Sequence, residues 1–67
     1  MTRKLMIDPP SGWMFGFPKY VDEATGIKVM DYDLDELGDY LMDKGYPEKF
    51  IDQVGWTRFM WINVDDH

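Results

Sequence analysis

The stretch from Asp33 to Gly55 constrains the fold more than any other, because it predicts two short helices joined by a tight turn. Asp33 stands three residues before Glu36, which is the spacing of a capping box at a helix start. Three leucines then follow at the three- and four-residue spacing of a single helical face. We expect all three to be buried: Leu34, Leu37 and Leu41.

Gly45 predicts the left-handed residue that ends the first helix, and Pro47 suits the first position of the second. The second helix is expected to end at Gly55 and to bury Phe50, Ile51 and Val54. Gly38 lies on the leucine side of the first helix, where an interior glycine costs roughly 1 kcal/mol relative to alanine. We therefore expect a neighbouring group, such as an aromatic ring, to press against its backbone.

Strand-like segments surround this helical pair. Residues 3–7 alternate between two faces, and residues 57–64 are rich in aromatic and β-branched side chains. Tyr20 and Val21 mark the beginning of another strand, residues 22–26 resemble a hairpin turn, and residues 27–30 are expected to return as a strand. The predicted fold class is α+β, a small antiparallel sheet of about three strands packed against a two-helix hairpin, in one domain spanning residues 1–67.

The last strand has apolar side chains on both faces, since Phe59 and Trp61 alternate with Met60, Ile62 and Val64. An antiparallel sheet that faces water normally carries polar residues on one side. We therefore expect the second face to be covered. Two candidates are a loop at residues 13–17 that folds back over the sheet, and a second copy of the chain.

The segment at residues 13–17 is dense in large apolar side chains and is bracketed by Gly and Pro, which favours a rigid loop. Trp13, Phe15 and Phe17 have two interpretations. They can close the core of a domain this small. They can also anchor an interface, because a rigid aromatic loop loses little entropy on docking.

Three strings in this chain resemble a known group: Asp8-Pro9-Pro10-Ser11-Gly12-Trp13, Gly16-Phe17-Pro18-Lys19 and, more loosely, Gly45-Tyr46-Pro47. The first two are similar to the N-terminal signature of short uncharacterised proteins from tailed bacteriophages of the T4-like and related kinds. The resemblance implies a phage origin and the cytoplasm of an infected bacterial host. It implies no activity and no functional residues.

The formal net charge is −6, and it is concentrated in residues 22–43, which contain eight carboxylates and one lysine. This balance argues against nucleic acid and anionic lipid as partners, because both favour Lys and Arg. No apolar run approaches the ~20 residues of a membrane span, and the first residues do not have the pattern of a secretory signal. A cytoplasmic protein with no membrane association is expected.

An acidic stripe is predicted on the first helix, opposite the leucines. Asp35, Asp39 and Asp43 are spaced four residues apart, about 6 Å per step, with Glu36 beside them. Like charges at this spacing cost roughly 0.2–0.5 kcal/mol per pair. The stripe is therefore either a solvated helix face or a surface that a basic partner recognises.

The residue types in the sequence give little support for catalysis, metal binding or a cofactor. The chain has no Cys and one His, at position 67. Residues 31–35 echo the start of a calcium loop, but Glu36 and Met42 stand where such a loop requires Gly and a bidentate Glu. A DNA-reading second helix is rejected because Lys49 is its only basic residue. We expect no enzyme activity, no cofactor and no bound metal.

The functional expectation is a small acidic module that binds a host or phage protein. Its predicted contact residues are Asp35, Glu36, Asp39, Asp43, Trp13, Phe15 and Phe17. The alternative is a structural or homo-oligomeric protein associated with the virion. An enzyme or metal protein comes last.

Overall fold

A computed structural model describes residues 2–64 of the chain. The elements follow one another as β1 (Thr2–Asp8), η1 (Gly12–Phe15), β2 (Lys19–Asp22), α1 (Glu23–Met30), α2 (Leu34–Asp43), η2 (Glu48–Trp56) and β3 (Arg58–Val64). The two α-helices are joined by a short loop, and η1 and η2 are 3-10 helices. The α+β class predicted from the sequence is confirmed.

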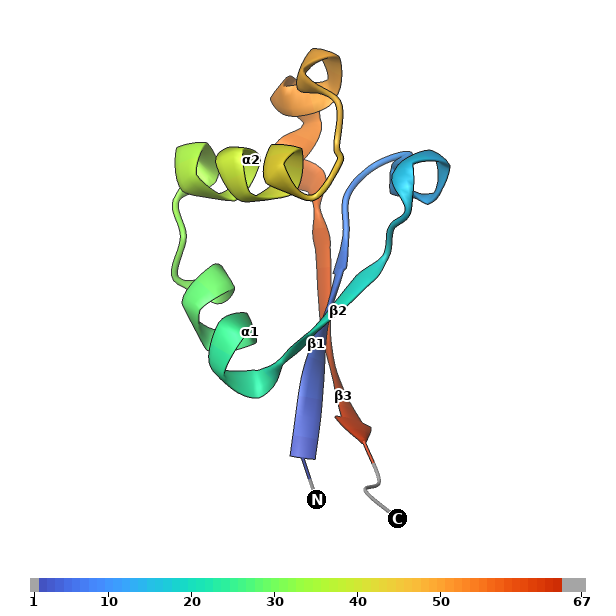
Figure 1. The fold of residues 1–67 in the computed structure, drawn as a ribbon. Helices are drawn as coiled ribbons and strands as arrows, with labels where there is room; N and C mark the ends of the chain where they lie inside the picture. Colours follow the sequence, from blue (N-terminus) through green and yellow to red (C-terminus); the bar gives the residue numbers. More distant parts are fainter. Residues whose placement is uncertain (1, 65–67) are drawn as a thin grey trace.

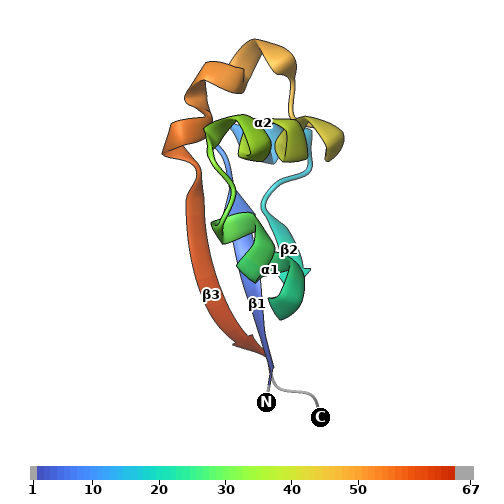
Figure 2. The same ribbon diagram turned by 90° about the vertical axis from the view of Figure 1, so that its left-hand side faces the viewer.

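The sheet is antiparallel with the strand order β2-β1-β3, so the first strand is central. Met6 on β1 lies opposite Tyr20 on β2 and Met60 on β3. Figures 1 and 2 show α1 and α2 on the same side of this sheet. Within residues 2–64, no helix lies over the opposite face of the sheet.

The core lies between the sheet and the helices. Its buried side chains come from every layer of the fold: Leu5, Ile7, Phe17, Val29, Leu37, Leu41, Tyr46 and Val54. Phe59 and Trp61, on the covered face of β3, pack against this cluster. The strands predicted at residues 3–7 and 57–64 are therefore present, and Tyr20 and Val21 belong to β2.

Both ends of α2 have the predicted caps. The Glu36 N–H donates to Asp33 Oδ1 at 2.8 Å, and the Asp33 N–H donates to Glu36 Oε1 at 3.3 Å, which completes the capping box. At the other end Gly45 has φ +107°, and the Tyr46 N–H reaches back to the Leu41 carbonyl at 2.9 Å. This six-to-one bond is that of a Schellman motif, so Gly45 ends the helix as expected.

The strand predicted at residues 27–30 and the hairpin turn at residues 22–26 are wrong, because Glu23–Met30 forms α1. Gly26 explains why a helix fits here. A Cβ atom on Gly26 would lie 2.7 Å from Trp61 and 2.9 Å from Leu5, so the glycine lets α1 rest directly on the sheet. That contact outweighs the strand preference of Ile27 and Val29, and the four residues 27–30 are too short a segment to show a helical period.

Three details of the helical pair also differ from expectation. Leu34 is 64% exposed, because it is the first residue of α2 and lies beyond the edge of the core, whereas Leu37 and Leu41 are buried. The neighbour expected against the backbone of Gly38 is present, but it is Ile51 and not an aromatic ring, with Ile51 Cδ1 2.8 Å from where a Cβ would lie. The second helix is a 3-10 helix that ends at Trp56.

Candidate functional site: an acidic groove and an aromatic hollow

A groove of about 480 Å³ runs between α2 and η2. Its apolar lining comes from Leu34, Ile51 and Val54, and Gly38 lets the two helices approach closely, because a Cβ there would lie 2.8 Å from Ile51 Cδ1. Its acidic lining comes from Asp35, Asp39 and Asp52. The groove therefore combines an apolar floor with carboxylates from both helices, which suits an apolar group that carries positive charge.

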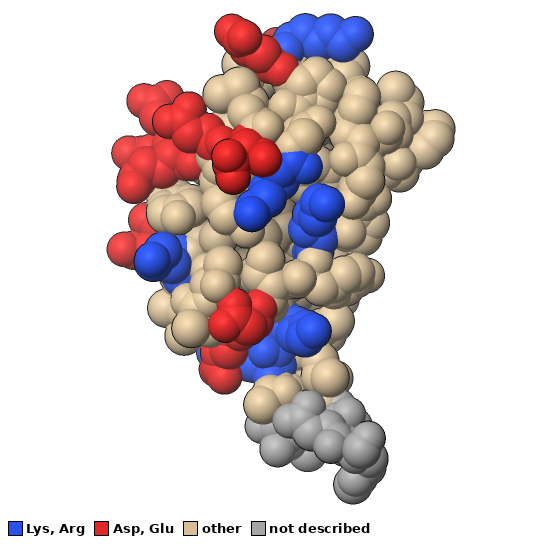
Figure 3. Space-filling model, viewed as in Figure 1, with Lys and Arg blue, Asp and Glu red and all other residues tan. Residues whose placement is uncertain are grey.

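The acidic stripe predicted on α2 is exposed along its whole length, and Figure 3 shows Asp and Glu side chains gathered over the helices at the left of the molecule. Its members differ in their surroundings. Asp35 and Asp39 line the groove. Glu36 is held by the capping box, and Asp43 lies outside the groove with Lys44 Nζ 4.0 Å from its carboxylate. The groove therefore uses two of the four predicted acidic residues.

The predicted aromatic segment divides between the core and the surface. Phe17 is 5% exposed, and its ring meets Tyr46 edge-on at a centroid distance of 5.9 Å. Phe15 is half-buried and meets the same Tyr46 ring at 6.1 Å. Trp13, in contrast, is 76% exposed. Phe15 and Phe17 close the core, and Trp13 is the one of the three that a partner can reach.

Trp13 shares a second hollow with Trp56, which is 75% exposed. The hollow has a volume of about 420 Å³ and lies where β1 runs into η1 and η2 runs into β3. Asp8 and Arg58, a cross-strand pair, line it together with Pro9 and Pro10. Tryptophan and arginine are enriched at the energetic centres of protein interfaces, so this hollow is suited to docking.

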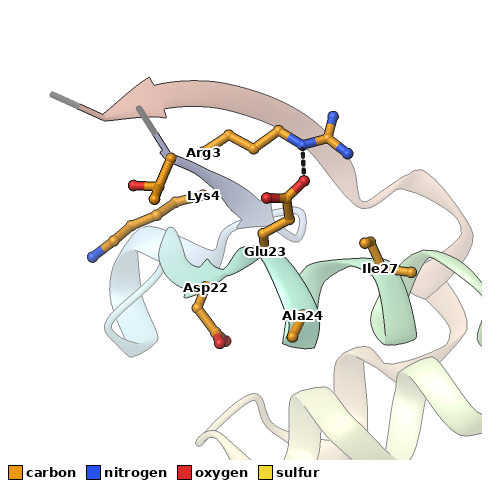
Figure 4. A pocket seen from close by; sticks show the side chains of 7 residues that line it. Arg3, Lys4, Asp22, Glu23, Ala24 and Ile27 are labelled. Atoms are coloured by element: carbon orange, nitrogen blue, oxygen red, sulfur yellow. Dashed lines mark hydrogen bonds and ion pairs between the residues drawn. The ribbon is translucent and has the colours of Figure 1, made fainter. Parts of the chain in front are cut away.

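A third hollow, of about 520 Å³, lies where the beginning of β1 meets α1. Figure 4 shows Arg3 pointing toward Glu23, and Arg3 Nε donates to Glu23 Oε2 at 2.7 Å. The Arg3 guanidinium also lies 4.0 Å from the centre of the Trp61 ring. Arg3 is thus engaged in fastening α1 to the sheet. Lys4 extends away from this pair, toward the other side of the sheet.

Two tyrosines have shifted acidities. Burial raises the pKa of Tyr46 above its usual value, and the charge of Asp52 adds to the effect. The Tyr46 hydroxyl donates to the Pro10 carbonyl at 2.8 Å. Burial also raises the pKa of Tyr40, with smaller contributions from Tyr32 and nearby carboxylates. Both phenols are therefore held in the neutral form, which is a structural role.

Within the described residues 2–64, no three His, Cys, Asp or Glu side chains gather in a way that could hold a metal ion. Over the same residues, none of the helices has the length and apolar character needed to cross a membrane.

Sequence reasoning missed the residues that tertiary packing adds to these surfaces. Asp52 and Leu34 join the acidic groove through the packing of η2 on α2, which no local pattern shows. Trp56 lies next to Trp13 only because β1 and β3 are paired. The position of Tyr46 did have a signal, because the residue after a left-handed glycine commonly packs against the last turn of the helix.

No protein-family model, curated protein or solved structure matches this chain in comparisons with known proteins.

Proposed function

We propose that this chain is a small acidic binding module, encoded by a phage, that contacts a host or phage protein in the infected cell and performs no chemistry. The observation that carries the proposal is the groove between α2 and η2, where Asp35, Asp39 and Asp52 surround an apolar floor. The phage origin rests on the resemblance of the N-terminal strings given above.

The groove supports this proposal better than the acidic stripe alone. A solvated helix face needs no apolar side chain beside its carboxylates, yet Leu34, which lines the groove, is 64% exposed. A Cβ atom on Gly55 would lie 3.9 Å from Leu34 Cδ2, so Leu34 forms one wall of the groove. Burying this leucine against a partner would gain roughly 1–2 kcal/mol from apolar area.

The partner surface that fits is basic and amphipathic. Lys and Arg side chains carry apolar stems that can lie on Leu34 and Ile51 while their charged ends reach Asp35 and Asp39. Carboxylates on one partner and cations on the other also speed the encounter, and this effect weakens as salt rises. A helix or loop rich in Lys or Arg is the expected binding segment.

The test is capture of a partner from bacterial host lysate by the immobilised protein. The double variant Asp35→Asn and Asp39→Asn removes two groove charges and keeps the side-chain size. We expect it to lose most of the captured protein, and we expect capture by the parent protein to weaken between low and high salt. Leu34→Ala should lower capture without changing its salt dependence.

The matched control is the double variant Asp31→Asn and Glu48→Gln, which removes the same number of charges from exposed positions outside the groove. It should capture the partner as the parent does. Equal capture by the groove variant and the control would refute the proposal, because the charge of the groove would then have no role in binding.

A further inference from the structure

The sheet face opposite the helices is open, with apolar side chains across its middle row and along β3. Its apolar side chains come from alternate positions on all three strands: Met6, Tyr20, Met60, Ile62 and Val64. Tyr20 and Met60 are each more than half exposed. The loop that the sequence offers as a cover does not lie over this face, since η1 lies beyond the end of the sheet (Figure 1).

The charges on this open face have a regular arrangement. Lys4 lies two residues before Met6 and Asp8 two residues after it, on the same side of β1. Each has an opposite charge on the next strand, because Lys4 is opposite Asp22 and Asp8 is opposite Arg58. The face is therefore neutral as a whole, whereas the helical side carries the acidic stripe.

We propose that the open face binds a second copy of this chain, sheet against sheet, about a twofold axis that crosses the strands at the Tyr20–Met6–Met60 row. Such an axis reverses the strand direction, so Lys4 of one copy faces the partner's Asp8, and Asp8 faces the partner's Lys4. Two sheets packed in this way keep their strands aligned at a spacing of about 10 Å. An axis parallel to the strands would instead place Lys4 against the partner's Lys4.

The distribution of net charge favours this face for self-association. Two copies that each carry −6 repel one another, and the repulsion is smallest when the acidic helices point away from the contact. Sheet-to-sheet packing places both sets of helices on the outside. The dimer would then present two acidic grooves, one on each outer side.

The available area is sufficient for a stable pair. The Trp13–Trp56 hollow begins at Asp8 and Arg58, so in this arrangement it lies over the far end of the partner's sheet. Two tryptophans that are three-quarters exposed, with Tyr20 and Met60, can bury on the order of 600 Å² per copy. The pair then buries about 1,200 Å², which is the lower bound of standard interfaces.

The experiment is sedimentation equilibrium of the purified protein over a range of micromolar concentrations. We expect a reversible dimer. Lys4→Glu and Asp8→Lys should each raise the dimer dissociation constant at least tenfold, because each places like charges face to face. An equimolar mixture of the two variants should regain the parent dissociation constant within about threefold, since both contacts are again of opposite sign in the mixed dimer.

Two further variants serve as controls for the dimer experiment. Lys28→Glu makes the same charge change on exposed α1 and should leave the dimer intact. Met60→Lys places a charge at the centre of the open face and should give a monomer with a parent-like circular dichroism spectrum. A parent protein that is monomeric at every concentration would overturn the proposal. A mixture that fails to recover dimerisation would overturn it as well.

Failure here is distinguishable from failure of the proposed function. Self-association is measured on the protein alone and involves the open sheet face. Partner capture depends on Asp35 and Asp39, which lie on the helical side.

Discussion

The packing of α1 on the sheet can be tested with one methyl group. Alanine in place of Gly26 would put its Cβ 2.7 Å from Trp61 Cη2 and 2.9 Å from Leu5 Cβ, where carbon atoms normally lie about 3.5–4.0 Å apart. Neither neighbour yields easily, because one is a rigid ring and the other is attached directly to the backbone of the central strand. The helix must therefore lift away from the sheet by roughly 1 Å.

The expected loss of unfolding free energy in Gly26→Ala is the difference between two opposing effects. Overpacking a core position costs about 1–3 kcal/mol, and replacing an interior glycine by alanine returns up to about 1 kcal/mol of helix propensity. We expect Gly26→Ala to lose about 1–2 kcal/mol of unfolding free energy. A chain of 67 residues has a total of roughly 3–10 kcal/mol, so this loss should lower Tm by about 5–15 °C.

Urea and thermal unfolding followed by circular dichroism measure this loss, and Gly38→Ala provides the matched control. A Cβ at Gly38 also meets a close neighbour, at 2.8 Å, but that neighbour is Ile51 Cδ1 at the end of a flexible side chain. Its rotation can relieve the contact, so Gly38→Ala should stay within about 1 kcal/mol of the parent. If Gly26→Ala were as stable as Gly38→Ala, α1 would not rest on Trp61 and the reasoning would fail.

The remaining predictions concern caps and tyrosines. Asp33→Ala should lower the unfolding free energy by about 1 kcal/mol in urea unfolding, because it removes the capping box of α2, whereas Asp35→Ala, an exposed residue of the same turn, should cost less. Equal losses would mean that the cap bonds contribute nothing. Tyr46→Phe should cost about 0.5–1.5 kcal/mol in the same assay, because the 2.8 Å bond to the Pro10 carbonyl is lost; an unchanged midpoint would contradict this. The pKa values of Tyr46 and Tyr40 are raised in the folded chain, so the stability these phenols contribute is complete below pH ~10 and is lost as the pH rises through the folded values. The urea midpoint of unfolding should therefore fall as the pH rises above ~10, and it should fall less in the double variant Tyr40→Phe and Tyr46→Phe. If both proteins lose the same stability, groups other than these two tyrosines cause the loss.

Local signals predicted α2 and its ends from the sequence. The bonds of the capping box join residues three apart, and Gly45 has the positive φ that its residue type favours. The strands β1 and β3 were also predictable to within one residue at each end, because alternation and β-branched residues mark a strand over seven residues. Each of these features depends on atoms that are close in the sequence.

Features that depend on tertiary contacts could not be predicted. Residues 23–30 form a helix because Gly26 fits under Trp61, a residue 35 positions later. The exposed carboxylates of α2 were expected from their spacing. The groove that they form with Asp52 and Leu34 was not, because it depends on where η2 packs against α2. The packing of Phe15 and Phe17 into the core and the exposure of Trp13 could not be predicted either, because the two phenylalanines are held there by their contacts with the distant Tyr46.

The place of β1 in the middle of the sheet has a consequence for synthesis on the ribosome. Thr2 pairs with Val64, so one side of the central strand has no backbone partner until nearly the whole described chain has been made. The helical segments can form early from neighbouring residues, but the sheet closes last, and it closes all at once. Fragments cut anywhere between Asp22 and Arg58 should therefore remain unfolded when kept apart and regain structure only when the two pieces are combined.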